Sequence, residues 1–143
     1  MKLVKIFFIP LLLILSACSD DEKTIDINKN PEEISIAFFS ALYNDKDLNK
    51  AAAVCVPKLS RIILHYRSAK AVGRHLFNLS YDKVKIRTED TGVKVRQMFK
   101  SKAIITIYFD GQYNDNRVMD VKRLSLIQFD GRWYIDKILK DPF

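Results

Sequence analysis

The run Ala103-Ile104-Ile105-Thr106-Ile107-Tyr108-Phe109 decides the fold, because it is rich in β-branched and aromatic residues on both of its faces. A run of this kind is typical of a strand that is covered on at least one side. We therefore predict a central strand over 103–109, with a helix packed on one face.

Segments with a period of two surround this strand, as expected of its neighbours in a sheet. Further strands are predicted over 79–87, 93–100, 117–129 and 133–139. The predicted turns between strands are Asp90-Thr91-Gly92, Asp110-Gly111 and Asp130-Gly131. Such short connections indicate an antiparallel meander. A bulge in the strand over 117–129 is the open alternative, because it would change which side chains face the core.

The strand over 79–87 is predicted to lie at an edge of the sheet. Its apolar residues Val84 and Ile86 alternate with Lys83, Lys85 and Arg87, which leaves one face in water. Lysines on an edge strand discourage further pairing.

The residues before 78 have helical periodicity instead. Asn30-Pro31-Glu32-Glu33 combines a capping residue, a proline at the first helical position and two carboxylates in the first turn. A first helix is predicted there, ending at the turn over 44–47, and a second over 48–55 after Asp47. A third is predicted over 58–77 after Pro57. Helices followed by an antiparallel meander predict an α+β fold with the helices packed on one face of a curved sheet.

The N-terminus resembles a bacterial lipoprotein signal. A short apolar run after Lys2 and Lys5 ends in Leu15-Ser16-Ala17-Cys18, which looks like the lipobox at which the signal is cleaved and Cys18 receives diacylglycerol and fatty acyl chains such as palmitate. A transmembrane helix would need roughly 20 apolar residues, and Pro10 interrupts this run. A plain secretory signal is the other alternative, although Ser-Ala-Cys departs from the usual cleavage pattern.

We therefore expect a cleaved signal peptide over 1–17, a lipidated Cys18 with a flexible tether over 18–30, and a single domain over 31–143. In lipoprotein sorting, an Asp directly after the lipidated cysteine retains a protein in the inner membrane. Here that residue is Ser19, which implies the outer membrane, facing the periplasm. Processing would leave Cys55 as a lone thiol, which we interpret as a small buried apolar residue.

The order of elements, the segment Ala37 to Pro57 and the closing Asp130-Gly131-Arg132-Trp133-Tyr134-Ile135 resemble the nuclear transport factor 2-like superfamily, specifically its small bacterial lipoproteins. The resemblance covers Pro31 to about Leu139. It implies a sheet that wraps around a helix as a cone, often with a pocket at the open end. Members differ in activity, so the resemblance implies no single function.

Some relatives are isomerases or dehydratases that place a carboxylate against an apolar pocket. The residues that such an enzyme could use here are Asp136 and Tyr108, and Tyr134 is a further hydrogen-bond donor. Other carboxylates, in predicted turns or on strands, are Asp110, Asp120 and Asp130. His65 and His75 are interpreted as surface or packing residues. No spacing of His, Cys or acidic residues predicts a metal, no glycine-rich loop predicts a phosphate site, and no cofactor is expected.

Charge is distributed unevenly along the chain, whose net charge is +7. The segment from Lys58 to Lys102 holds twelve Lys or Arg against three acids, a net charge of +9. Within it, Arg67, Lys70 and Arg74 would share one side of a continuous helix over 58–77. An exported lipoprotein does not meet nucleic acid, so the expected partners of this basic patch are anionic lipids, lipopolysaccharide or an acidic protein. A solvated face is the alternative.

The sequence leaves three functions open. The leading one is a non-catalytic binding or interaction module, with a small apolar ligand in the cone or an acidic envelope partner on the basic patch. The second is an isomerase or hydratase-like enzyme. The third is a dimerising structural protein of the envelope, which Tyr108, Phe129 and Trp133 would support if they were exposed together.

Overall fold

A computed structural model describes residues 25–26, 28–88 and 96–141 of the chain. The predicted signal peptide, Cys18, most of the tether and the turn at 90–92 lie outside these ranges. Within them, the helices are α1 (Pro31–Tyr43), α2 (Leu48–Ala53), α3 (Pro57–His65) and α4 (Ala69–Leu76). The strands are β1 (Lys83–Arg87), β2 (Arg96–Phe99), β3 (Lys102–Tyr113), β4 (Asn116–Phe129) and β5 (Arg132–Leu139). None of the helices in this part of the chain has the length and apolar character needed to span a membrane.

The strands form one antiparallel sheet in the order β1-β3-β4-β5, and β2 also pairs with β3. Because β4 pairs along the other side of β3, β1 and β2 lie one after the other on the same edge of β3. The predicted central strand is thus confirmed as part of β3, and the predicted edge position of Lys83–Arg87 is confirmed for β1. Its paired segment is shorter than the predicted 79–87.

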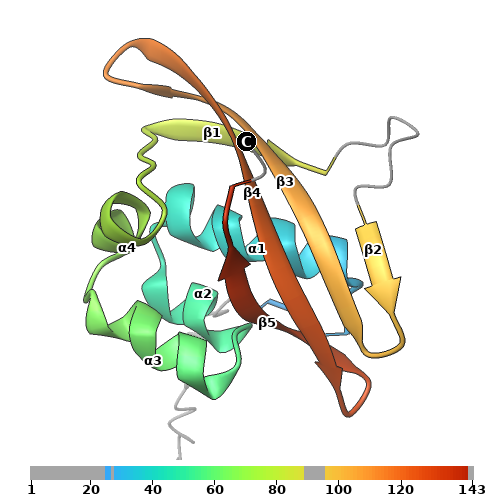
Figure 1. Ribbon diagram of the computed structural model, residues 1–143. Coiled ribbons are helices and arrows are strands. Elements are labelled where there is room, and N and C mark those ends of the chain that lie inside the picture. The colour runs from blue at the N-terminus through green and yellow to red at the C-terminus, as the bar shows by residue number, and fades with distance from the viewer. Residues whose placement is uncertain (1–24, 27, 89–95, 142–143) are drawn as a thin grey trace, which may run out of the picture.

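The helices lie on one face of the twisted sheet (Figure 1). Alternate residues of β3 are buried, and α1 contacts β1, β3 and β5. Phe39 of α1 packs edge-to-face on Phe109 of β3, with ring centroids 4.8 Å apart. This arrangement confirms the α+β fold with helices on one face of an antiparallel sheet, and it places the core between α1 and β3.

The predicted first helix begins where the sequence indicated. The side chain of Asn30 accepts a hydrogen bond from the Glu33 N–H at 2.8 Å, and the Glu33 carboxylate accepts one from the Asn30 N–H at 3.3 Å. Together they form a capping box. Ile34, Phe38 and Leu42 are buried along the face that meets the sheet.

The single helix predicted over 58–77 is wrong, because the chain breaks between α3 and α4. Arg67 has a φ of 63°, in the left-handed region, and its N–H donates to the Leu64 carbonyl at 3.1 Å. The Ser68 side chain then caps α4 by accepting from the Ala71 N–H at 3.1 Å. This side-chain cap on the backbone of α4 is a local hydrogen-bonding alternative to a continuous helix.

The predicted turn at Asp110-Gly111 is also wrong, since both residues lie inside β3. The hairpin instead turns at Asn114-Asp115, whose φ values of 48° and 62° suit a two-residue turn. Gly111 serves a different purpose. A Cβ there would lie 2.6 Å from the Lys83 carbonyl and 2.7 Å from the Tyr81 ring, so its absence lets the start of β1 lie directly against β3.

An irregularity does occur in the long strand pairing, between β4 and β5. Ser125 pairs with Lys137 and Leu126 pairs with Ile135, so Asp136 is the extra residue and the bulge belongs to β5. Ile135 is consequently buried and Lys137 exposed. The predicted turn at Asp130-Gly131 is confirmed between β4 and β5.

Candidate functional site

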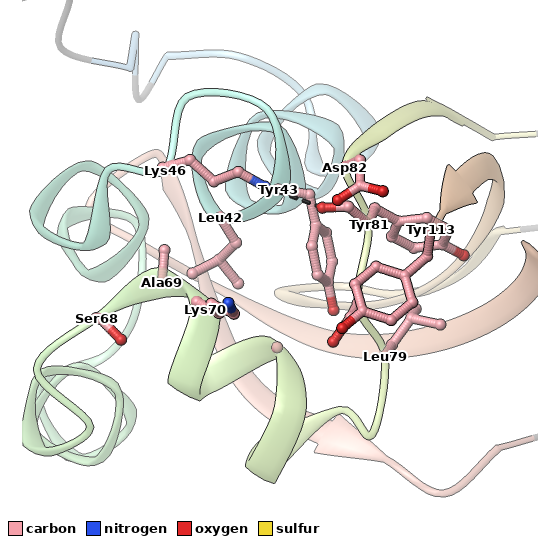
Figure 2. Close-up of a pocket in the computed structure, with 12 residues that line it drawn as sticks. Leu42, Tyr43, Lys46, Ser68, Ala69, Lys70, Leu79, Tyr81, Asp82 and Tyr113 are labelled. Carbon is pink, nitrogen blue, oxygen red and sulfur yellow. Dashed lines mark hydrogen bonds between the residues drawn. The ribbon is translucent and has the colours of Figure 1, made fainter. Parts of the chain in front are cut away.

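A pocket of about 460 Å³ opens between the end of α1, the first turns of α4 and the segment that leads into β1. Figure 2 shows Tyr43, Tyr81 and Tyr113 gathered along one side of this tyrosine pocket, with Ser68, Ala69 and Lys70 along the other. Its volume is within the range of small-molecule sites. The walls come from four separate parts of the chain.

Tyr43 and Tyr81 form the inner wall of the tyrosine pocket, where they join the aromatic core. Their rings lie perpendicular, with centroids 5.3 Å apart. Tyr81 stacks on Phe109 at 6.0 Å, and Tyr43 stacks on Phe39 at 6.2 Å. This packing fixes both rings, because each is held on more than one side.

The hydroxyl groups of Tyr43 and Tyr81 have no hydrogen-bond partner among the described residues, although both side chains are buried. Burial raises the pKa of Tyr43 far above its usual value, and the nearby Tyr81 and Asp120 raise it further. Burial likewise raises the pKa of Tyr81, with the charges of Asp120 and Asp110 adding to the effect. Both phenols are therefore neutral donors at ordinary pH, and a buried donor without a partner costs free energy.

A polar cluster lies on the helix-covered side of β4. Asp120 is opposite Phe109 and Lys122 is opposite Ile107, and directly paired residues share one face of a sheet. The Lys122 side chain is only 7% exposed, and its Nζ lies 3.3 Å from Asp120 and 2.8 Å from Asp141. Lys122 is thus a buried cation held by two carboxylates, one of them beyond the end of β5.

The rim of the tyrosine pocket carries charge of both signs. Lys46 donates from Nζ to the Tyr81 carbonyl at 3.0 Å, and Asp82 accepts from the Asn114 N–H at 2.8 Å. Lys70 is exposed and forms no ion pair with any described residue. Of these three side chains, Lys70 is the one available for an anionic group of a ligand.

The structure does not bring Asp136 and Tyr108 together. Tyr108 is half-buried and pairs with Val121, in a shallow hollow with Arg87, Met119 and Asp141. Asp136 lies in the β5 bulge, opposite the step from Ser125 to Leu126. Neither lines the tyrosine pocket.

Asp110, Asp130 and both histidines lie outside the tyrosine pocket. Asp110 forms a two-point ion pair with Arg117 at 2.7 and 2.8 Å, which lowers the pKa of the carboxyl. Asp130 is exposed in its turn. His65 and His75 are exposed on either side of Tyr66, and His75 stacks on it with ring centroids 6.2 Å apart.

Cys55 is buried, as predicted, and donates from Sγ to the Ala51 carbonyl at 3.5 Å. Burial raises the pKa of its thiol far above the usual value. The thiol therefore stays protonated and is a poor nucleophile.

The predicted basic patch does not lie on one helix. Arg67 occupies the break, while Lys70 and Arg74 are one turn apart on α4, and all three are exposed. Trp133 is only 6% exposed, whereas Phe129 is 72% exposed. Tyr108, Phe129 and Trp133 are therefore not exposed together, so the observation that would have supported a dimer is not found.

No group of three or more His, Cys, Asp or Glu side chains within residues 25–26, 28–88 and 96–141 is placed to hold a metal ion. The tyrosine pocket was missed by sequence analysis, which assigned no functional role to Tyr43. Tyr81 gave no signal, because nothing in a local pattern joins it to Tyr43. Searches of protein family models, curated proteins and solved structures find no match to this chain.

Proposed function

We propose that this chain is a lipid-anchored protein of the cell envelope, attached at Cys18 to the outer membrane and facing the periplasm, whose domain binds a small, partly apolar ligand without transforming it. The domain would have the nuclear transport factor 2-like cone. The α+β order of elements and the helices on one face of the sheet support that fold.

The unpartnered hydroxyl of Tyr43 carries the binding proposal. It belongs to a ring that is 3% exposed, lines a pocket and is fixed by three aromatic neighbours. A ligand with a hydrogen-bond acceptor would satisfy it, while Leu42 and Leu79 would contact an apolar part. Lys70 at the rim would attract an anionic end. The polar side chains at the rim would then fix the orientation of a ligand whose apolar part contacts the inner wall.

Native mass spectrometry of the anchored protein, extracted in mild detergent from its own envelope, tests this proposal. We expect a small bound mass. Tyr43→Phe keeps the ring and removes the hydroxyl, so it should reduce ligand retention on the order of tenfold, the loss of about one hydrogen bond. The free energy of unfolding should stay unchanged or rise by up to about 1 kcal/mol, because an unpartnered buried donor is removed.

Tyr66→Phe is the matched control, because Tyr66 is a half-buried tyrosine outside the pocket. It should leave ligand retention unchanged. Equal retention in Tyr43→Phe and the native protein, or the absence of any small mass, would contradict binding in the tyrosine pocket.

An isomerase or hydratase-like enzyme is the second candidate, and Asp120 rather than Asp136 favours it. Asp120 is paired with Phe109, whose ring packs against both Tyr43 and Tyr81, and its charge raises the pKa of both phenols. Its role would be that of a general base. If Asp120→Asn leaves the mass and structure of the recovered ligand unchanged, the enzyme is excluded and the binding module stands.

A further inference from the structure

The exposed faces of α3 and α4 carry cations without any acid. No Asp or Glu occurs between Leu48 and Tyr81. Figure 1 shows the two helices together on the side of the molecule remote from β2. We use the term basic helix face for the five exposed Lys and Arg residues of this side, namely Lys58, Arg61, Arg67, Lys70 and Arg74.

None of these five cations forms an ion pair within the described residues, whereas three cations elsewhere in the domain do. Lys50 pairs with Asp45, Arg117 with Asp110, and Lys122 with two carboxylates. Because no described acid forms an ion pair with the basic helix face, an external anionic surface would meet little competition there.

Apolar side chains flank the cations on α3. Ile62 and Leu64 are 42% and 41% exposed, one on each side of the buried Ile63. At 100° per residue they border the exposed strip that contains Lys58 and Arg61. In this position the two aliphatic side chains would contact the boundary of the acyl chains while the cations meet the headgroups of a bilayer.

We infer that the basic helix face docks on an anionic phospholipid surface. This inference rests on the anchoring at Cys18 proposed above, because an anchor keeps the domain within reach of the bilayer. Under that condition even a weak electrostatic attraction orients the domain. The five cations are spread over two helices. An extended anionic surface such as a bilayer can contact all of them, whereas a single acidic side chain would pair with one. Docking would fix which side of the domain faces the membrane.

Lysine reactivity in reconstituted protein tests the inference. The lipidated protein is placed in vesicles of phosphatidylcholine alone, or of phosphatidylcholine and phosphatidylglycerol in equal parts, and treated with a water-soluble amine reagent. We expect Lys58 and Lys70 to react several-fold more slowly on the anionic vesicles. Lys83, Lys85 and Lys137 are exposed on the sheet and serve as internal references that should not change. Added salt should abolish the difference.

Two triple variants distinguish an effect of the basic helix face from an effect of the net charge of the domain. The variant R61Q/R67Q/R74Q removes three arginines and keeps both reporter lysines, so it should lose the protection. The control R87Q/K102Q/R132Q removes three exposed cations from the sheet and should keep it. Equal reactivity on both vesicle types, protection that survives R61Q/R67Q/R74Q, or protection lost equally in the control would overturn the inference.

Failure of the anchoring proposal is seen separately, in the mass of the N-terminal peptide. If that peptide is not lipidated, co-sedimentation of the chain with the same two vesicle types replaces reconstitution, and equal sedimentation overturns docking. Protection of Lys58 and Lys70 that requires added envelope protein rather than anionic lipid would also overturn it, in favour of an acidic protein partner.

Discussion

The burial of two phenols at one site has a consequence at alkaline pH. The unfolded chain loses phenolic protons above a pH of about 10, the ordinary pKa of tyrosine. Folded Tyr43 and Tyr81 keep theirs, because burial and nearby carboxylates raise both pKa values. Below pH about 10 both states keep these protons, and the two groups do not change the free energy of unfolding. Above it the unfolded chain alone releases them, so the free energy of unfolding falls as the pH rises.

We expect urea unfolding midpoints to fall as the pH rises above about 10, and to fall less steeply in Tyr43→Phe, which has one fewer raised pKa. Midpoints measured across this pH range for both proteins check the expectation. The same slope in the two proteins would mean that the Tyr43 hydroxyl is not shielded from water.

Single residues were predictable where the reason is local. Cys55 was predicted to be buried because no base or cation is adjacent to it and its neighbours are small and apolar. Tyr43 and Tyr81 were not predictable as a pair, since their meeting depends on how the segment before β1 crosses the end of α1. The pairing of Asp110 with Arg117 required the position of the hairpin, which the sequence placed too early.

At the level of elements, two glycines of similar sequence context have different roles. Gly111→Ala should destabilise the domain by about 1–3 kcal/mol, since its Cβ would meet the Lys83 carbonyl and the Tyr81 ring. Gly131→Ala should cost roughly 1–2 kcal/mol for a different reason, its φ of 75° in open space. Chemical denaturation measures both losses.

The two variants differ in which strand they loosen. Amide hydrogen exchange should speed up in β1 for Gly111→Ala and stay unchanged there for Gly131→Ala. Equal protection of β1 in both would contradict the close approach of β1 to β3.

The helix break was missed and the turn was misplaced because, in both places, the local composition does not match the structure that forms. Tyr66-Arg67-Ser68 contains neither Gly nor Pro, so the break is indicated locally only by Ser68, a residue type that caps helices. Asp110-Gly111 has the composition of a turn, yet pairing with β1 uses the same glycine for close approach. Helix α1 was predicted well because capping, proline and periodicity all agree at Asn30 to Leu42.

For the whole molecule, the order of elements followed from periodicity, because long helical and strand patterns are the most reliable signals in a sequence. The candidate site did not follow, since its walls come from α1, α4, the segment before β1 and the end of β3. A pocket of that origin exists only after the helices have packed on the sheet.

Asp141, which lies beyond the end of β5, is held to the sheet through one buried cation, Lys122. Lys122→Ala should destabilise the domain by about 3 kcal/mol, because it leaves the partly buried Asp120 without its partner. Asp141→Asn should cost about 1 kcal/mol or less, since the Asp141 side chain is 52% exposed. Denaturant unfolding of both variants checks the order of the two losses, and a larger loss for Asp141→Asn would contradict it.

The proposed lipid anchor would decide the environment in which the tyrosine pocket and the basic helix face act, and substitution of Cys18 tests it. Cys18→Ala should abolish lipidation, because no other side chain at that position can form the thioether. The full chain should then retain its signal peptide, since lipoprotein signal cleavage is expected to follow lipidation. Mass spectrometry of the N-terminal peptide and metabolic labelling with a fatty acid measure both effects. Cys55→Ala is the control and should leave the label in place. A native protein without the label would contradict the anchor and would leave the pocket as the property of an unanchored domain, whereas a labelled Cys18→Ala protein would place the lipid on another residue.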